Sequence, residues 1–436
     1  MPDEIYLDHN ATTPLAPEVL EAMQPYLRGR HGNPSCAHRQ GREAREGIEH
    51  VRRIISETYG CARDEVVFTS GGTEANNLAI KGAALANEER GKHIVIGSAE
   101  HPCVADAARF LQRFGWEVGE AKVDEHGQVT PEALEAAIRP DTALISIMTA
   151  QNVVGTINRI DELNEVVAGR RIVFHTDAAQ AVGKIPTAIP FMGADLVTIA
   201  GHKFYGPKGV GALIVRRNTK LEPLFHGAGH ERGMRSGTEN TPAIVGLGAA
   251  VELARAKMAE AGERMVALRD GLQHLLADAL PGVLLNGHPL DRLPNTLNLS
   301  FLGVTGAEIA ERVPELMLAT GPACHDRAGG LSPTFAALGL SPERSLSSLR
   351  LSLGRKNTWD EMQYTAERLI ATVRELRQAA GWDEASAPAS TRPICPRCEQ
   401  PLELDLGGIA PRMVCPLAPE CRYEAYLAAP AGAYSD

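Results

Sequence analysis

The sequence is short of three features that would place it in other classes of protein. Among its 436 residues, no apolar run approaches the roughly 18 residues that a membrane-spanning helix needs. The first residues, MPDEIYLDHNATTP, have neither a basic flank nor an apolar stretch, so we expect no signal peptide and a cytoplasmic protein. Basic residues are in deficit, with 44 Lys and Arg against 54 Asp and Glu, which argues against bulk nucleic-acid binding.

Cysteine is sparse over most of the chain. Four of the eight cysteines are scattered and the other four are crowded near the C-terminus. The scattered ones are Cys36, Cys61, Cys103 and Cys324, and the crowded ones are Cys395, Cys398, Cys415 and Cys421. Thiols stay reduced in the cytosol, where a tight cluster indicates a metal site and a lone cysteine indicates buried filler or a catalyst. We interpret the first three scattered cysteines as structural.

Short apolar runs alternate with helical stretches in the first half of the chain. This alternation predicts an α/β fold with a large, doubly wound, mainly parallel sheet. The expected strands cover residues 65–69, 93–96, 143–148, 171–176, 196–199 and 211–215.

The pattern changes at residue 247, where apolar residues recur every three or four positions up to residue 275. This spacing predicts one long helix that connects two domains, with a coiled coil as the alternative. Residues 295–301 and 348–353 alternate like half-buried strands of a small α+β domain. We therefore expect a large domain over 1–245, a small one over 246–380, a linker over 381–393 and a separate module over 394–428.

Three features in the large domain point together to one cofactor. Asp177 ends an apolar run, at the sheet edge where open α/β folds bind ligands. Lys203 lies among glycines and aromatics, where a desolvated lysine can form a Schiff base. Gly71, Gly72 and Thr73 open a helix whose N–H groups can hold a phosphate. Each feature alone also has a plain structural explanation, but their order and combination are what pyridoxal phosphate requires.

At these residues the sequence resembles the cysteine desulfurases of the NifS/IscS type, in the class-V aminotransferase group of pyridoxal-phosphate fold type I. The resemblance runs from about residue 5 to about residue 375. Its matching segments are YLDHNATTP, GNPSCAHRQG, VVFTSGGTEANNLAIKG, EHPCV, QNVVGTI, HTDAAQAVGK, GHKFYGPKGVGAL, RSGTEN, NTLNLSF, ATGPAC and SSLRLSLGR.

The resemblance implies a role for each matching position. Lys203 would bind the cofactor covalently and carry a proton, Asp177 would keep the pyridine nitrogen protonated, and His101 would stack on the ring and act in catalysis. The remaining implied contacts to the cofactor are those of its phosphate, with Gly72, Thr73, Ala200 and His202, and of its phenolic oxygen, with Asn152 and Gln180. Thr238 would reach the phosphate of a neighbouring subunit, which implies a homodimer.

The substrate's carboxylate is expected to meet Arg350. Strand alternation places Arg350 on the face opposite Leu349 and Leu351, where its planar fork can hold a carboxylate, although a surface salt bridge would fit the pattern too. The resemblance makes Arg350 the carboxylate clamp, with Asn33 as a second contact.

Cys324 is the decisive residue for the reaction. Its surroundings are rich in glycine and polar residues, which predicts a mobile loop and a poor place to bury a thiol. In the family this thiolate takes the substrate's sulfur as a persulfide and leaves alanine. Where the family has Ser or Thr after this cysteine, the chain has His325, whose role the sequence leaves open.

The C-terminal module has the layout of a zinc ribbon. Cys395 and Cys398 form one knuckle, Cys415 and Cys421 form the other, and an alternating strand with a Gly-Gly turn lies between them. The module also resembles the ribbons at the end of type IA DNA topoisomerases, which leaves single-stranded DNA contact through Tyr423 and Tyr426 as an alternative. A bound iron ion or a redox dithiol are further alternatives to zinc.

These features together predict a pyridoxal-phosphate-dependent cysteine desulfurase that acts on L-cysteine and passes sulfur to an acceptor protein. A selenocysteine lyase and a class-V aminotransferase are the alternatives. The sequence does not identify the acceptor, and iron–sulfur cluster assembly is one of several destinations open to the sulfur.

Overall fold

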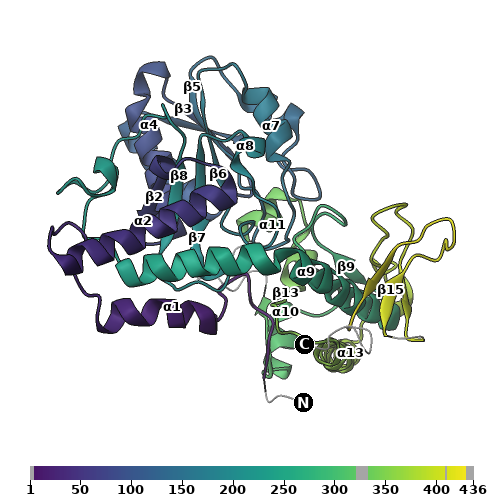
Figure 1. The fold of residues 1–436 in the computed structure, drawn as a ribbon. Coiled ribbons are helices and arrows are strands. Elements are labelled where there is room, and N and C mark those ends of the chain that lie inside the picture. Colours follow the sequence, from purple (N-terminus) through teal and green to yellow (C-terminus); the bar gives the residue numbers. More distant parts are fainter. Residues whose placement is uncertain (1–3, 321–331, 408–409, 429–436) are drawn as a thin grey trace.

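The computed structural model describes residues 4–320, 332–407 and 410–428. It shows a large unit around a seven-stranded sheet, a smaller unit around a four-stranded sheet, and a three-stranded sheet near the C-terminus (Figure 1). Among the described residues, no helix combines the length and the apolar character needed to span a bilayer.

The large sheet is mainly parallel, as predicted. Its strand order is β2 (Val66–Thr69), β8 (Gly211–Val215), β7 (Leu196–Ala200), β6 (Val173–Asp177), β5 (Thr142–Ser146), β3 (His93–Gly97) and β4 (Glu117–Ala121). The strands from β7 to β4 run parallel, whereas β8 is antiparallel to both β2 and β7. Six of these strands match the predicted runs. The sequence pattern missed β4 because its residues, EVGEA, are polar and only partly buried.

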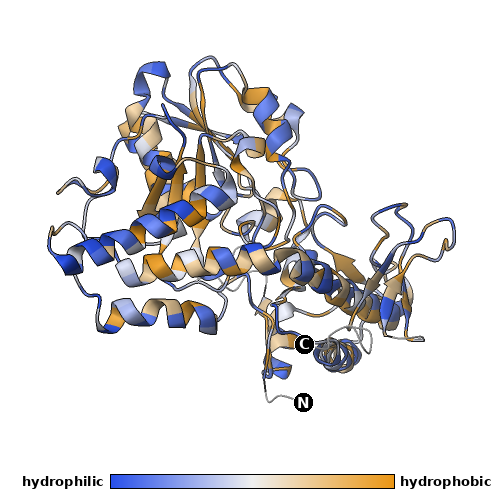
Figure 2. Cartoon of the chain, in the orientation of Figure 1, coloured by the Kyte–Doolittle hydropathy of each residue, from blue (hydrophilic) through white to orange (hydrophobic). Residues whose placement is uncertain are grey.

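Helices cover both faces of this sheet and create two cores. Along β8, Ala212 and Ile214 enter one core, and Leu213 and Val215 enter the other. The first core is closed by α1 (Pro17–Arg28), α2 (Arg39–Tyr59), α7 (Ile160–Val167) and α8 (Ile189–Met192). The second is closed by α5 (Pro102–Leu111) and by one helix formed from α3 (Gly72–Asn77), the π-helical turn η2 (Leu78–Gly82) and α4 (Ala83–Ala86). Figure 2 shows the apolar central strands between more polar helices. Helix α6 (Pro131–Ala137) and short helices η1 (Arg63–Glu65), η3 (Glu88–Arg90), η4 (Gln112–Phe114) and η6 (His230–Gly233) complete the unit.

One helix, α9 (Thr241–Ala279), joins the two units as predicted (Figure 1). Asn240 caps its start by accepting a hydrogen bond from the Ala243 N–H, and Pro281 follows its end. The small unit contains the sheet β12 (Ala319–Thr320), β13 (Ser348–Ser352), β10 (Thr296–Phe301) and β9 (Val283–Leu285). Its other helices are α10 (Gly306–Arg312), α11 (Pro333–Ala337), α12 (Pro342–Leu346) and α13 (Trp359–Ala380).

Two features of the small unit differ from expectation. Strands β10 and β13 are buried along their whole length and not on one face only. The N-terminal residues, which we placed with the large domain, pair with the small unit through β1 (Ile5–Tyr6) and β11 (Leu316–Met317). Ile5 and Leu7 lie in the core of the small unit. The exact domain boundaries stay a prediction.

The C-terminal module is an antiparallel sheet of β14 (Glu403–Asp405), β15 (Arg412–Val414) and β16 (Glu424–Tyr426). It does not stand apart from the rest of the chain, because Leu402, Met413 and Leu427 belong to the same apolar core as the small unit. The predicted linker is also held in place. It includes the short helix η7 (Glu384–Ser386), and the Thr391 N–H donates to the Val283 carbonyl at 2.8 Å. Hydrogen bonding thus fixes a segment whose composition suggested a flexible tether.

Candidate functional site

A cavity of about 600 Å³ lies at the carboxyl edge of the large sheet, facing the small unit. Asp177 reaches it from the end of β6, Lys203 from the short helix η5 (Gly201–Lys203) after β7, and Arg350 from β13 of the small unit. Most of the predicted site residues line it together. These are Gly72, Thr73, His101, Asn152, Asp177, Gln180, Ala200, His202, Lys203 and Arg350.

Lys203 is prepared to react as an amine. Its Nζ donates to the backbone carbonyls of Asn10 and Ala11, both at 2.8 Å. Burial, and then the positive charge of Arg350, lower the pKa of Lys203 to about 8. A lysine with this pKa is partly neutral near neutral pH, and the neutral amine is the form that attacks a carbonyl carbon.

Asp177 is buried and held in one orientation. Its Oδ2 accepts a hydrogen bond from Asn76 Nδ2 at 2.6 Å, and its Oδ1 accepts one from the Ala179 N–H at 2.9 Å. The carboxylate is therefore fixed at the strand end, where it can hold a proton on a ring nitrogen.

Glycine suits two of the positions predicted to cradle a phosphate, Gly72 through its packing and Gly71 through its backbone conformation. A Cβ atom at Gly72 would lie 3.1 Å from the Ala200 Cβ, and Gly71 has a positive φ of 151°. The helix that begins here brings the backbone of Gly72 and Thr73 to the cavity wall. Nearby, His202 Nδ1 lies 3.1 Å from Thr12 Oγ1. Burial, and then Lys203, lower the pKa of His202 to about 4, so this ring is neutral.

His101 is fixed through its Nδ1 atom, which caps the start of α5. This atom accepts a hydrogen bond from the Cys103 N–H at 3.2 Å and lies 2.9 Å from Cys103 Sγ. Asn76 Nδ2 lies 3.1 Å from the same sulfur. Burial, and then Asp177, raise the pKa of Cys103 to about 12, so it is a thiol and not a nucleophilic thiolate.

Gln180 belongs to a buried polar network that sequence reasoning missed. Lys184 Nζ donates to Gln180 Oε1 at 2.6 Å and to Asn10 Oδ1 at 3.0 Å, and Gln180 Nε2 donates to the Asn10 carbonyl at 2.9 Å. Burial, then Lys203 and Arg350, lower the pKa of Lys184 well below its ordinary value. The sequence shows only part of this network, because Lys184 follows Gln180 by four residues, whereas Asn10 lies 174 positions before Lys184.

Arg350 is buried, whereas strand alternation suggested that it lies on an open face. Its Nη2 donates to Asp8 Oδ1 at 2.6 Å and its Nη1 donates to the Asn152 carbonyl at 3.1 Å. The buried Nε has no hydrogen-bond partner among the described residues. A guanidinium with one unpaired donor facing a shared cavity suits a ligand carboxylate.

Three other predicted residues are not brought into this cavity. Asn33 is exposed, and its Oδ1 accepts a hydrogen bond from the Ser35 N–H at 2.9 Å. Thr238 is exposed on the loop before α9. Cys324 lies outside the described residues, as does its neighbour His325. The roles of all three predicted residues stay predictions.

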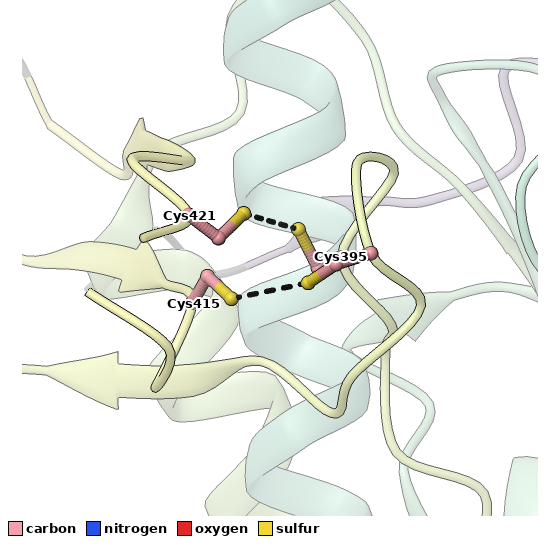
Figure 3. Close-up of side chains that lie close together, drawn as sticks. Cys395, Cys415 and Cys421 are labelled. Atoms are coloured by element: carbon pink, nitrogen blue, oxygen red, sulfur yellow. Dashed lines mark hydrogen bonds between the residues drawn. The ribbon is translucent and has the colours of Figure 1, made fainter. Parts of the chain in front are cut away.

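The four C-terminal cysteines meet at one point (Figure 3). The Sγ atoms of Cys395 and Cys421 are 3.6 Å apart, those of Cys398 and Cys415 are 3.4 Å apart, and all four lie within 4.8 Å of one another. Sulfur atoms around a tetrahedral zinc ion at about 2.3 Å are separated by about 3.8 Å, whereas bonded sulfurs are about 2.05 Å apart. The arrangement thus fits one metal ion bound by four thiolates. Tyr423 is partly buried against the shared core, and its contact with single-stranded DNA stays a prediction.

The cavity fits pyridoxal phosphate. A reactive amine, a buried fixed carboxylate, a helix start and a neutral imidazole surround a space of about 600 Å³, and each suits one part of that cofactor.

Comparisons with known proteins agree with this chemistry. Residues 5–365 match the model of the class-V aminotransferase family, and the match ends before the four-cysteine module. The cysteine desulfurase IscS of Dictyoglomus turgidum is 44% identical over 379 residues, which cover 86% of this chain and 96% of that protein. The structure of a NifS-like protein is 33% identical with a TM-score of 0.80, covering 85% of this chain and 100% of that one. The structure titled SspA in complex with cysteine is 35% identical with a TM-score of 0.68, covering 80% of this chain and 98% of the other.

Proposed function

This chain belongs to the cysteine desulfurases of the class-V aminotransferase family, and we propose that it converts L-cysteine to L-alanine while Cys324 takes the sulfur atom as a persulfide. The observation that supports this most directly is the meeting of Lys203, Asp177 and Arg350 around one cavity, although Arg350 comes from the other unit. An amine, an acid and a carboxylate clamp are what an amino-acid substrate of pyridoxal phosphate needs.

When bound, pyridoxal phosphate supplies a pyridine ring that withdraws electrons from the substrate's Cα. In our proposal the backbone of Gly72 and Thr73, with Ala200 and His202, holds its phosphate. Asp177 keeps the proton on the ring nitrogen, His101 packs on the ring, and Asn152 and Gln180 orient the phenolic oxygen.

Lys203 has two roles in this proposal. It carries the cofactor between turnovers, and it moves the proton at Cα of the substrate. The two hydrogen bonds from Nζ to the carbonyls of Asn10 and Ala11 support this assignment, because they hold the amine of a residue that lines the cavity. The pKa of about 8 allows the same nitrogen to accept and release a proton at physiological pH.

Arg350 binds the substrate's carboxylate, and Asn33 is a second contact. Arg350 meets Asp8 in the structure, so an arriving carboxylate competes with the Asp8 carboxylate for the guanidinium. Thr238 lies on an exposed loop outside its own cavity, which supports our proposal that it reaches the cofactor of a partner subunit in a homodimer.

The sulfur transfer is balanced without an outside oxidant. The thiolate of Cys324 attacks the sulfur of the substrate, the bond between that sulfur and Cβ breaks, and the electron pair of this bond leaves with the carbon. Protonation of that carbon gives alanine, and the enzyme holds a persulfide that an acceptor protein in the cytoplasm then receives. The four-cysteine module, which we propose binds zinc, stabilises the small unit or contacts that acceptor.

The test is release of alanine and sulfide from L-cysteine by the cofactor-loaded protein in the presence of a reductant. We expect equal amounts of the two products, and loss of both in Cys324→Ala. Cys36→Ser is the matched control, because Cys36 lies outside the cavity, and it should keep full activity. An intact cofactor band without alanine would overturn the proposal, and turnover of L-selenocysteine alone would then identify a lyase.

A further inference from the structure

A second cavity, of about 440 Å³, lies beside α9 and the start of α1. Its lining comes from His9 and residues 14–18, from Tyr205, from one face of α9 between Leu253 and Arg264, and from Arg355 and Lys356. It shares no lining residue with the active-site cavity. The two are nevertheless neighbours, because residues 10–12 line one cavity and residue 9 and residues 14–18 line the other.

Positive charge dominates this second cavity. Four cations line it, Lys257, Arg264, Arg355 and Lys356, against the two carboxylates of Glu18 and Glu260. This local excess of positive charge contrasts with the net charge of −10 of the whole chain. A concave surface with excess positive charge attracts anions.

Two side chains that line this cavity, Arg355 and His9, each have a buried atom without a hydrogen-bond partner in the described structure, Nη2 and Nδ1 respectively. His9 is only 7% exposed. Native proteins rarely leave such atoms unpaired, because each one has lost its hydrogen bonds to water. An acceptor oxygen from a ligand would pair with the guanidinium, and the neutral imidazole can donate to another.

The guanidinium of Arg355 is held in place for such a contact. Its carbon lies 4.4 Å from the centre of the Tyr205 ring, and the backbone N–H of Arg355 donates to the Tyr205 hydroxyl at 2.7 Å. Arg264 fixes the same loop by donating to the carbonyls of Arg355 and Asn357. A guanidinium fixed by its neighbours loses little conformational entropy when it binds an anion.

We propose that this cavity is a binding site for a small organic anion, a carboxylate or phosphate ester attached to an apolar body. The anionic group would meet Arg355 and the two lysines, and the apolar body would lie against Pro14, Leu15 and Leu253. This site does not depend on the proposed desulfurase activity.

The test is calorimetric titration of the cofactor-loaded protein with phenyl phosphate, with phenol as the uncharged control. We expect phenyl phosphate to bind and phenol not to bind. The variant Lys257→Gln/Lys356→Gln changes two exposed side chains and should weaken binding about tenfold, since each lost charge-assisted contact reduces affinity severalfold. Arg355→Gln should weaken it further.

A second variant separates this site from the active site. Arg350→Gln removes the proposed carboxylate clamp but lies outside the second cavity, so it should leave the affinity for phenyl phosphate unchanged. Loss of binding in Arg350→Gln with unchanged binding in the lysine variant would place the probe in the active site and overturn the proposal. Equal binding of phenol, or no binding of phenyl phosphate at millimolar concentration, would overturn it as well.

Discussion

Loss of the metal that we propose for the four-cysteine cluster should destabilise the small unit and not only the C-terminal sheet. The change we consider is Cys398→Ser, because Cys398 is the one ligand of the four that is not fully buried, so serine is tolerated there sterically. Without its fourth ligand the cluster should lose its metal, and with it the cross-link that holds the ends of the short strands β14, β15 and β16 together. The unfolding of this sheet would expose part of a shared core.

The size of the effect follows from that core. Leu402, Met413 and Leu427 are each at most 2% exposed. Burial of each such side chain contributes about 1.5–3 kcal/mol to stability. Exposure of all three would therefore lower the free energy of unfolding by about 5–9 kcal/mol. Leu427 also packs directly on α9, because a Cβ atom at Gly271 would lie 2.6 Å from its Cδ2. Domains are stable by only about 5–15 kcal/mol, so we expect unfolding to begin at least about 10 °C lower.

Differential scanning calorimetry, with metal content measured on the same samples, tests this prediction. Cys36→Ser is the matched control, since it replaces a partly buried cysteine outside the cluster and should change neither the metal content nor the unfolding temperature. The reasoning would be refuted if Cys398→Ser contained no metal and still unfolded at the temperature of the unchanged protein.

Three further predictions concern the active site. Arg350→Gln should raise the KM for L-cysteine about 10- to 100-fold with an unchanged circular dichroism spectrum, because it removes a charge-assisted contact to the carboxylate; an unchanged KM would exclude Arg350 as the clamp. In cofactor-free protein, the rate at which pyridoxal phosphate attaches to Lys203 should be half-maximal near pH 8 and level off about one pH unit higher, since the pKa of Lys203 is about 8; a rate that is half-maximal only near pH 10 would contradict this value. Cys103→Ala should lower kcat about 3- to 10-fold by removing the contacts of the thiol with His101 Nδ1 and Asn76 Nδ2, and Cys103→Ser should restore it; equal kcat values for the two variants would show that the thiol's polarity is irrelevant.

Local patterns predicted the elements of the fold because each is decided by a few neighbouring residues. The long helix α9 and six strands of the large sheet were predicted from apolar spacing alone. Alternation along β13 placed Arg350 opposite the leucines correctly, but it could not show that a second layer covers that face. The burial of both faces depends on the N-terminal segment, which is more than 300 residues away in sequence; Asp8, for example, bonds to Arg350.

The same limit applies to the site. The residues that bear the chemistry lie in short segments that the sequence displays, and most of them line the cavity. The residues that hold them in place were missed. Asn76 fixes Asp177 across 101 positions, and Lys184 meets Asn10 across 174 positions, so no local pattern connects either pair.

The N-terminal segment connects Arg350, the proposed carboxylate clamp, with Lys203, the proposed cofactor lysine, although the two belong to different units. Leu7 is packed in the core of the small unit, and Asp8 binds Arg350 there. Two residues later, the carbonyls of Asn10 and Ala11 hold Lys203 Nζ of the large unit. Residues 8–11 therefore contact both Arg350 and Lys203. Any relative motion of the two units must move this stretch, and with it the amine, the clamp or both.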